Sequence, residues 1–423
     1  MTAESSATRM PEIRVPAGLT FLGLGLGLVL GWVLRTSPSA APIQAVAGPI
    51  GRLWLQALTM TILPLVAALL FNGVVETIAA ARGGTTARRA LGLILGILVA
   101  SAALGAVLTP LLLRFSPVPP NAAAAMGAQN ADPGPVPGAA DFLASLIPGN
   151  IVAAAAENAM LPVIVFFALL AVASTRLAEA PRRSLAVLFE AIAGAMMVVI
   201  GWVLAVAPVG VFGLAFAVAV SSGGAAIGAL AHYVVIVTCV GSVIFLGGYA
   251  LAVFAGGRSP LAFARAMLPA QAVAFSTQSS LASLPAMLVS CRRLELREST
   301  SEFVLPLAVA LFRSTGPAMN MAVVIYAAHL TGVTLTPTAL AVGALTAFAT
   351  TFGAVSLPGA ISFVTSAGPI AIAMGVPVEP LALLVAVEML PDLMRTIGNV
   401  TMDVAITTVV DRHEEEPAAE TVH

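Results

Sequence analysis

Five polar residues lie on one face of an otherwise apolar segment near the carboxyl end of the chain: Glu388, Asp392, Arg395, Asn399 and Asp403. Counted from the first, the others follow after 4, 7, 11 and 15 residues. At about 100° per residue the five fall within roughly one quarter of a helix circumference, with Thr396 at its edge. Because the flanking stretches "LALLVAV" and "VAITTVV" are apolar, this is not a solvated helix surface. We predict a helix whose polar stripe faces a binding site.

The stripe carries groups that could hold a small acidic zwitterion. Arg395 can bind a carboxylate through two parallel N–H donors, and Asp392 can accept from an ammonium group. An amino acid with an acidic side chain would satisfy both. Charges at the centre of a membrane cost about 2.5–3.5 kcal/mol each on insertion scales and are usually functional. The alternative is a structural network in which Asp392 and Arg395 pair only to hold helices together.

Two further segments carry polar groups among apolar ones. The hydroxyl-rich "STQSSLAS" at 276–283 could donate to a carboxylate, although serines in membrane helices also bond to their own carbonyls. In "LPLAVALFRSTGPAMNM", 305–321, Arg313 is a charge at membrane depth, and Gly316 with Pro317 favours an unwound helix. Arg313 could instead extend to a membrane surface.

The other polar residues of the apolar runs stand alone, and we interpret them as core or interface residues: His232, His329, Glu157 and Glu190.

The composition is that of a polytopic membrane protein. Of 423 residues 59% are hydrophobic and only 9% charged, with a mean hydropathy of +1.02, whereas soluble proteins carry about a quarter charged residues. No basic run predicts a nucleic-acid partner. Cys239 and Cys291 are predicted to be free thiols. The sequence predicts no cofactor and no certain metal site, and "GLGLGLVLG" at 23–31 lies within a membrane span, where a dinucleotide fold is excluded.

Apolar runs long enough to span a bilayer can be placed along the first 256 residues. The candidate spans are 17–35, 50–77, 88–113, 146–175, 184–220 and 226–256. The first is too long for a signal-peptide core, so we predict a membrane helix. Arginines concentrate in the segments 1–15, 78–89, 176–183, 257–265, 291–298 and 411–413. The positive-inside rule therefore predicts that these segments and both termini are cytoplasmic, in the inner (plasma) membrane. The Pro- and Ala-rich 116–141 is predicted to be a flexible external loop.

The C-terminal third contains two interrupted apolar runs. Residues 259–290 begin and end beside cytoplasmic arginines, with Pro285 inside, and 335–376 are interrupted by Pro358 and Gly359. Paired Gly/Pro-interrupted segments in two halves indicate a transporter's binding site. We predict two re-entrant helical hairpins in inverted repeats.

These motifs together resemble the dicarboxylate/amino acid:cation symporter family, which has the glutamate transporter fold, over about residues 17–411. "AFSTQSSLASLP" resembles the first hairpin tip, "SLPGA" the second, and "DLMRTIGNVTMD" the eighth helix. The resemblance implies that Asp392 binds a substrate amino group and Arg395 its side-chain carboxylate. The rest of the implied substrate pocket comprises Ser279, Ser280, Pro358, Gly359, Thr396 and Asn399. The residues implied in cation binding or coupling are Glu388, Asn399, Asp403, Ser314 and Arg313.

The resemblance also implies an all-α fold of eight transmembrane helices and two hairpins, in a homotrimer surrounded by lipid that works as an elevator. The implied cytoplasmic parts are a segment 1–16 and a tail 412–423. Residues 17–220 are implied to be mainly scaffold and trimerisation helices, except that the third helix, 88–113, belongs to the transport domain. The transport domain itself is implied to comprise 226–411, with hairpins 259–290 and 335–376 and helices 301–331 and 378–411.

The seventh helix departs from the family pattern. Where the family carries Asn-Met-Asp-Gly-Thr, the chain has Phe312, Arg313, Ser314, Thr315 and Gly316. A cation-binding carboxylate is thus lost and a fixed positive charge is gained. We therefore predict weakened or altered sodium coupling. In this hypothesis Arg313 acts as a tethered cation, and a proton on Glu388 is the alternative to sodium as the coupled ion.

The leading hypothesis is a symporter for an acidic amino acid or dicarboxylate, with L-aspartate or L-glutamate expected first. An uncoupled channel or a transport-dead sensor on the same scaffold is the second. The third, an intramembrane hydrolase, lacks a nucleophile with a matching base, and we predict that the protein is not an enzyme.

Overall fold

Every regular element in the parts of the chain that the structure describes is a helix. The structure is a computed structural model, and it describes residues 16–82, 84–119, 147–157, 159–222, 225–351 and 359–413. In the first half the helices are α1 (Ala17–Leu34), α2 (Ala40–Thr59), α3 (Ile62–Ala80), α4 (Thr85–Phe115), α7 (Ile151–Ala156), α8 (Met160–Ser174), α9 (Glu179–Ala205) and α10 (Ala207–Ser222). In the second half they are α11 (Ala225–Ala250) with the π-helical turn η1 (Leu251–Ala255), α12 (Pro260–Thr277), α13 (Leu284–Arg293), α14 (Glu298–Leu311), α15 (Gly316–Thr331), α16 (Pro337–Thr351), α17 (Gly359–Ala373), α18 (Leu381–Val387) and α19 (Met389–Arg412).

The helices confirm the predicted all-α membrane class. Five helical stretches are long and apolar enough to cross a bilayer: Ala40–Ala80, Thr85–Phe115, Glu179–Ala205, Ala226–Ala255 and Glu298–Thr331. Shorter apolar helices add Gly18–Leu34, Met160–Ser174, Ala207–Val220 and Pro337–Thr351. A membrane helix needs about 20 apolar residues, and each span predicted from the sequence coincides with one of these helices or with two in succession.

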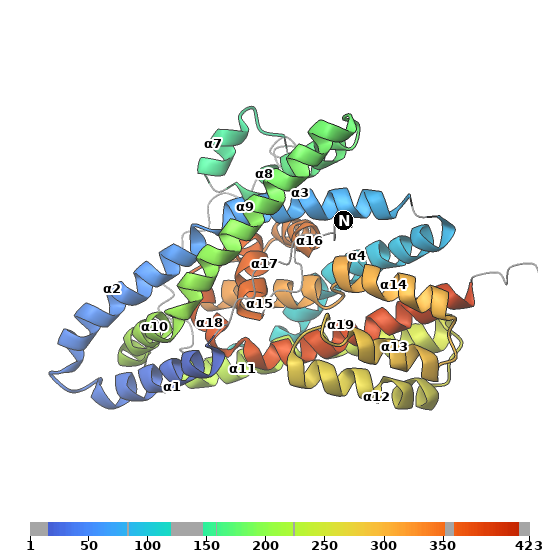
Figure 1. Ribbon diagram of the computed structural model, residues 1–423. Coiled ribbons are helices and arrows are strands. Elements are labelled where there is room, and N and C mark those ends of the chain that lie inside the picture. Colours follow the sequence, from blue (N-terminus) through green and yellow to red (C-terminus); the bar gives the residue numbers. More distant parts are fainter. Residues whose placement is uncertain are drawn as a thin grey trace, which may run out of the picture.

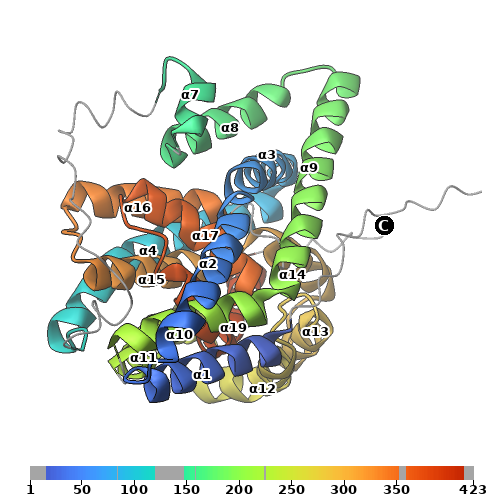
Figure 2. The ribbon, with the colours of Figure 1, turned by 90° about the vertical axis from the view of Figure 1, so that its left-hand side faces the viewer.

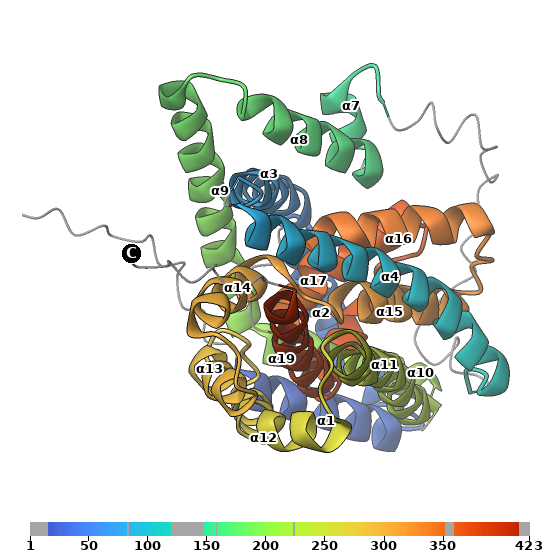
Figure 3. The ribbon, with the colours of Figure 1, turned by 90° about the vertical axis from the view of Figure 1, so that its right-hand side faces the viewer.

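The core lies around α15 and α19, which other helices enclose. Almost every residue of α15, and α19 from Arg395 to Asp411 with one exception, is buried. Figure 3 looks nearly along α19 and places α4, α11, α13 and α14 around it. In Figures 1 and 2, α7 and α8 lie at one edge of the molecule and α12 at the opposite edge. A helix that is apolar all round is stable only when it is enclosed in this way or faces lipid.

Helix α1 packs unusually closely against α10. A Cβ atom added to Gly27 would lie 2.7 Å from the backbone oxygen of Phe212, and one added to Gly31 equally close to that of Phe216. Small residues at such spacing let membrane helices approach backbone to backbone. Glycine is therefore required here for packing.

Each interrupted segment contains a pair of helices in contact where it is described, and re-entry into the membrane stays a prediction. Helices α12 and α13 form the first hairpin, joined by residues 278–283, with Gln278 in the left-handed region (φ 51°). Helices α16 and α17 lie side by side as the arms of the second. Its tip, including Pro358, lies outside the described residues, as do most of the loop 116–141 and most of both terminal segments.

Candidate functional site

The polar stripe predicted on α19 is buried inside the protein. The exposed fraction is 1% for Glu388, 5% for Asp392 and Thr396, 3% for Arg395, 2% for Asn399 and 0% for Asp403. Buried charges are stable only when they are paired or bind a ligand. The partners of each group therefore define the chemistry of the site.

Arg395 is the centre of a network that joins three helices. Its NH1 donates to Asn320 Oδ1 of α15 at 2.8 Å, and its NH2 donates to Glu388 Oε1 in an ion pair. Its Nε lies 3.2 Å from Asp392 Oδ1, as an ion pair without hydrogen-bond geometry. Tyr233 of α11 donates to Glu388 Oε2 at 2.8 Å. Each nitrogen of the guanidinium thus faces a protein acceptor, and Glu388 holds the position that a bound carboxylate could take.

The helix break between α14 and α15 is attached to α19 through Asn399. Asn399 Oδ1 accepts from the backbone N–H of Thr315 at 2.9 Å, and the hydroxyls of Ser314 (3.2 Å) and Thr315 (2.8 Å) also point to it. Gly398 permits this approach, because a Cβ there would lie 2.5 Å from Thr315 Cγ2. A carbonyl oxygen has two lone pairs, so the protein's own donors occupy this one.

The other side of the break is held by Ser101 of α4. Its hydroxyl donates to the Ser314 carbonyl at 2.5 Å and accepts from Ala318 N–H at 3.2 Å. Both are backbone groups that an unbroken helix would satisfy internally. The unwound segment predicted from Gly316 and Pro317 is confirmed, and Ser101 and Asn399 stabilise it.

Asp403 and Arg313 are the two charged members of the set whose side chains form neither a hydrogen bond nor an ion pair with any described residue. Both carboxylate oxygens of Asp403 are buried and unpartnered. Arg313, in the helix break, experiences the charges of Asp392 and Asp403 and the repulsion of Arg395. Arg313 itself is half-buried, within electrostatic range of these charges.

No hydrogen bond or ion pair between described residues links Ser279 or Ser280 of the first hairpin to the polar stripe. Ser279 Oγ accepts from Ala282 N–H at 3.2 Å within its own turn, and Ser280 is half-buried beside it. Gly359 begins α17. Thr396 donates to its own helix, to the Asp392 carbonyl at 3.0 Å. The structure thus brings together the predicted residues of the break between α14 and α15, Arg313 and Ser314, with those of the segment 388–403, and the hairpin assignments stay predictions.

Three residues of the candidate site were not predicted from the sequence: Tyr233, Asn320 and Ser101. Each is a polar side chain in an apolar helix, which is the signal that could have indicated them. The described residues contain no group of three or more His, Cys, Asp or Glu side chains arranged to hold a metal ion.

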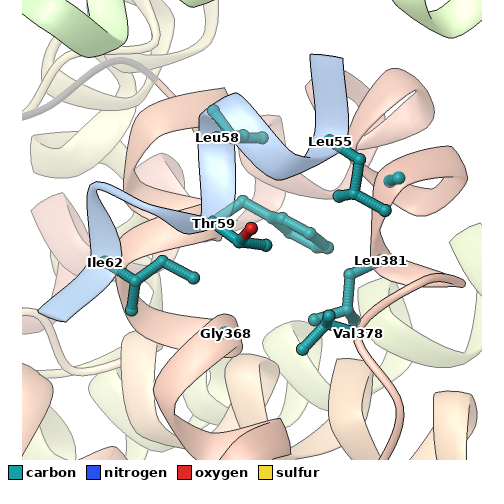
Figure 4. A pocket seen from close by; sticks show the side chains of 9 residues that line it. Leu55, Leu58, Thr59, Ile62, Gly368, Val378 and Leu381 are labelled. Carbon is teal, nitrogen blue, oxygen red and sulfur yellow. The ribbon is translucent and has the colours of Figure 1, made fainter. Parts of the chain in front are cut away.

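A separate small hollow lies between α2 and α3 on one side and α17 and α18 on the other (Figure 4). Its lining is Leu55, Leu58, Thr59, Ile62, Phe363, Gly368, Val378, Leu381 and Ala382. With one hydroxyl and no charge, it does not suit an acidic substrate.

Comparison with known proteins identifies the family of the chain. The model of the sodium:dicarboxylate symporter family matches residues 18–413.

The chain belongs to this family.

Three relatives illustrate how similar this chain is to known transporters. It is 29% identical over 275 residues to a proton/glutamate-aspartate symporter of Escherichia coli, covering 64% of the chain and 62% of the relative. It is 28% identical to C4-dicarboxylate transport protein 1 of Pseudomonas aeruginosa, covering 65% and 61%. It is 26% identical to a proton/sodium-glutamate symport protein of Bacillus subtilis, covering 95% and 94%. The matches to the first two thus span about three fifths of those relatives.

The family confirms the resemblance noted in the sequence. The family and these relatives are transporters and not enzymes, so the hydrolase hypothesis is dropped. The chain is a multi-pass membrane protein.

Proposed function

We propose that this protein is a secondary active symporter for an acidic amino acid, L-aspartate or L-glutamate, in the inner (plasma) membrane. The observation that carries the proposal is the buried set of Arg395, Asp392 and Glu388 on α19. Relatives named for glutamate, aspartate and C4-dicarboxylates support the same substrate class.

Substrate recognition would replace contacts that the protein now makes with itself. The side-chain carboxylate of the substrate takes the place of Glu388 on Arg395 NH2, while Asn320 keeps NH1 in position. The substrate ammonium pairs with Asp392, whose present partner is Arg395 Nε at 3.2 Å. After the exchange Arg395 and Asp392 each keep a charge partner, as buried charges require, and only Glu388 loses its own.

Proton coupling through Glu388 follows from this exchange. A substrate carboxylate that displaces Glu388 from Arg395 leaves a buried carboxylate without its cation. Protonation removes that charge, and Tyr233 remains a hydrogen-bond partner. A proton then enters with each substrate.

Sodium coupling is weakened for two reasons. Both lone pairs of Asn399 Oδ1 face protein donors, and hard cations need several free oxygen ligands at short range. Arg313 adds a fixed positive charge near Asp403 and Asp392. We infer that its guanidinium serves as a tethered cation in place of a bound ion.

The transport cycle is proposed to be an elevator within a homotrimer. The scaffold comprises most of 17–220, and the moving transport domain comprises 226–411 together with α4. The apolar hollow in Figure 4 falls on the boundary between α2 and α3 of the first and α17 and α18 of the second. Both termini are proposed to face the cytoplasm.

Uptake of radiolabelled L-aspartate into proteoliposomes tests the function. Accumulation above the external concentration under an inward proton gradient supports the symporter. The second candidate, a channel or transport-dead sensor on the same scaffold, is favoured by Arg313. A channel equilibrates substrate without accumulation, and a sensor binds it without flux.

A further inference from the structure

A series of polar side chains runs from the surface of the protein to Glu388. It begins at Ser116, an exposed residue that ends α4. Its hydroxyl lies 2.9 Å from Nε2 of His232, a partly buried residue of α11, and His232 Nδ1 lies 3.2 Å from the hydroxyl of Tyr326 on α15. His232, which stands alone in the sequence, is thus part of a chain of contacts between three helices.

The hydrogen bonds indicate which ring nitrogen of neutral His232 carries the proton. The hydroxyl of Tyr326 donates to the Ala229 carbonyl at 2.8 Å, so His232 Nδ1 carries a proton and donates to Tyr326. The unprotonated Nε2 then accepts from Ser116. This nitrogen, at the outer end of the chain of contacts, is where a further proton can bind.

The inner end is Tyr233, which is fully buried beside Tyr326. The two rings meet edge to face with centroids 5.4 Å apart. Tyr233 donates to Glu388 Oε2 at 2.8 Å. No hydrogen bond joins the two phenols, both of which are described, so this step requires a movement of the rings or a bridging water that connects the two hydroxyls.

Among the described residues, Tyr233 is the one neutral hydrogen-bond donor to Glu388. The groups that act on Glu388 are Arg395 and Asp392, both on α19, and Tyr233 on α11. Arginine is not deprotonated in proteins and does not relay protons. His232 is faced by Ser116 from the end of α4 and by Tyr326 from α15, both uncharged.

We propose that Ser116, His232, Tyr326 and Tyr233 form a proton path between the outer surface and Glu388. This rests on the proposed proton coupling. His232 binds a proton at Nε2 and passes the one at Nδ1 to Tyr326. Tyr326 passes its own proton to Tyr233, which protonates Glu388 Oε2. One proton leaves the solution, one arrives at the carboxylate, and every intermediate group regains its original charge. The His232 ring flips or exchanges tautomers to reset.

The first test follows protonation directly and needs no transport. In the full-length protein in nanodiscs, infrared spectroscopy after a rapid fall in pH records the C=O band of protonated Glu388, assigned by its loss in Glu388→Gln. We expect Tyr233→Phe, Tyr326→Phe and His232→Gln to slow the rise of this band about tenfold or more. Tyr249→Phe is the matched control on α11: its hydroxyl accepts from Gln271, away from the path, and the rate should be unchanged.

The second test uses transport. Net uptake of L-aspartate driven by a proton gradient should slow in the same three variants, while Tyr249→Phe should keep the rate of the unmodified protein. The phenylalanine variants keep both rings, and thermal unfolding checks their folding. Unchanged rates of the Glu388 band in Tyr233→Phe and Tyr326→Phe would overturn the path. If the unmodified protein accumulates no acidic substrate, the proposed function fails, and the infrared rates still decide the path.

Discussion

At the scale of single residues, Asp392 distinguishes substrates that carry an amino group from those that do not. Succinate offers two carboxylates but no ammonium, so Asp392 would have to share Arg395 with the substrate and would gain no cation of its own, which is unfavourable for a buried charge. We expect L-aspartate to compete for uptake far better than succinate, and Asp392→Asn to remove this preference. Competition assays in proteoliposomes measure it, with Glu379→Gln, an exposed carboxylate, as the control. Equal competition by succinate in the unmodified protein would contradict the role of Asp392.

Arg395 is expected to select for the acidic side chain and to stabilise the fold. Arg395→Cys should shift preference toward neutral amino acids, because no cation then meets the substrate's second carboxylate. It also leaves Glu388 and Asp392 without their buried partner, which costs about 3–5 kcal/mol.

The two effects separate in a double variant. Arg395→Cys with Glu388→Gln removes one stranded charge, so its melting temperature should lie above that of Arg395→Cys alone while the shift toward neutral substrates persists. A double variant less stable than the single one would show that Glu388 does not depend on Arg395 for its charge pairing.

At the scale of elements, one side of the break between α14 and α15 is held by a single side chain of α4, Ser101. Ser101→Ala leaves the Ala318 N–H and the Ser314 carbonyl without their partner, and an unsatisfied buried group costs about 1–3 kcal/mol. We expect a lower melting temperature and reduced binding, since the same segment contacts Asn399. In the control Ser242→Ala, the lost bond goes only to the Thr238 carbonyl of the same helix, so little change is expected. Equal melting temperatures for the two variants would exclude this role of Ser101.

The elements and the stripe could be predicted because local signals specify them. Helical period places Glu388 and Asp403 on one face, and Gly316 with Pro317 indicates a break. The partners across helices could not be predicted. Whether Tyr233 or Asn320 reaches the stripe depends on how far α11 and α15 are shifted and rotated against α19, and no pattern within one helix records that. The ion pair between Glu388 and Arg395 was not expected either, although both residues were singled out, because it depends on the side-chain conformations at the turn between α18 and α19.

At the scale of the whole molecule, three carboxylates and two guanidinium groups set the ion requirement of the transport site. Glu388, Asp392 and Asp403 oppose Arg313 and Arg395, and all of them interact within one buried region. The formal charge of these groups is thus one negative, whereas the family's Met and Asp at positions 313 and 314 would make it three negative. A buried charge without compensation is expensive, so the site needs about two fewer bound cations to carry the same anionic substrate.

We therefore expect initial uptake at fixed pH to be nearly independent of sodium concentration and to rise with an inward proton gradient. The combined variant Phe312→Asn, Arg313→Met and Ser314→Asp restores the family's residues at these positions and lowers the formal charge by two. It should gain partial sodium dependence, because it returns an amide and a carboxylate oxygen as cation ligands. The measurement is initial uptake against sodium concentration for both proteins, with choline replacing sodium. A steep, sigmoidal sodium requirement in the unmodified protein would mean that Arg313 replaces no bound cation.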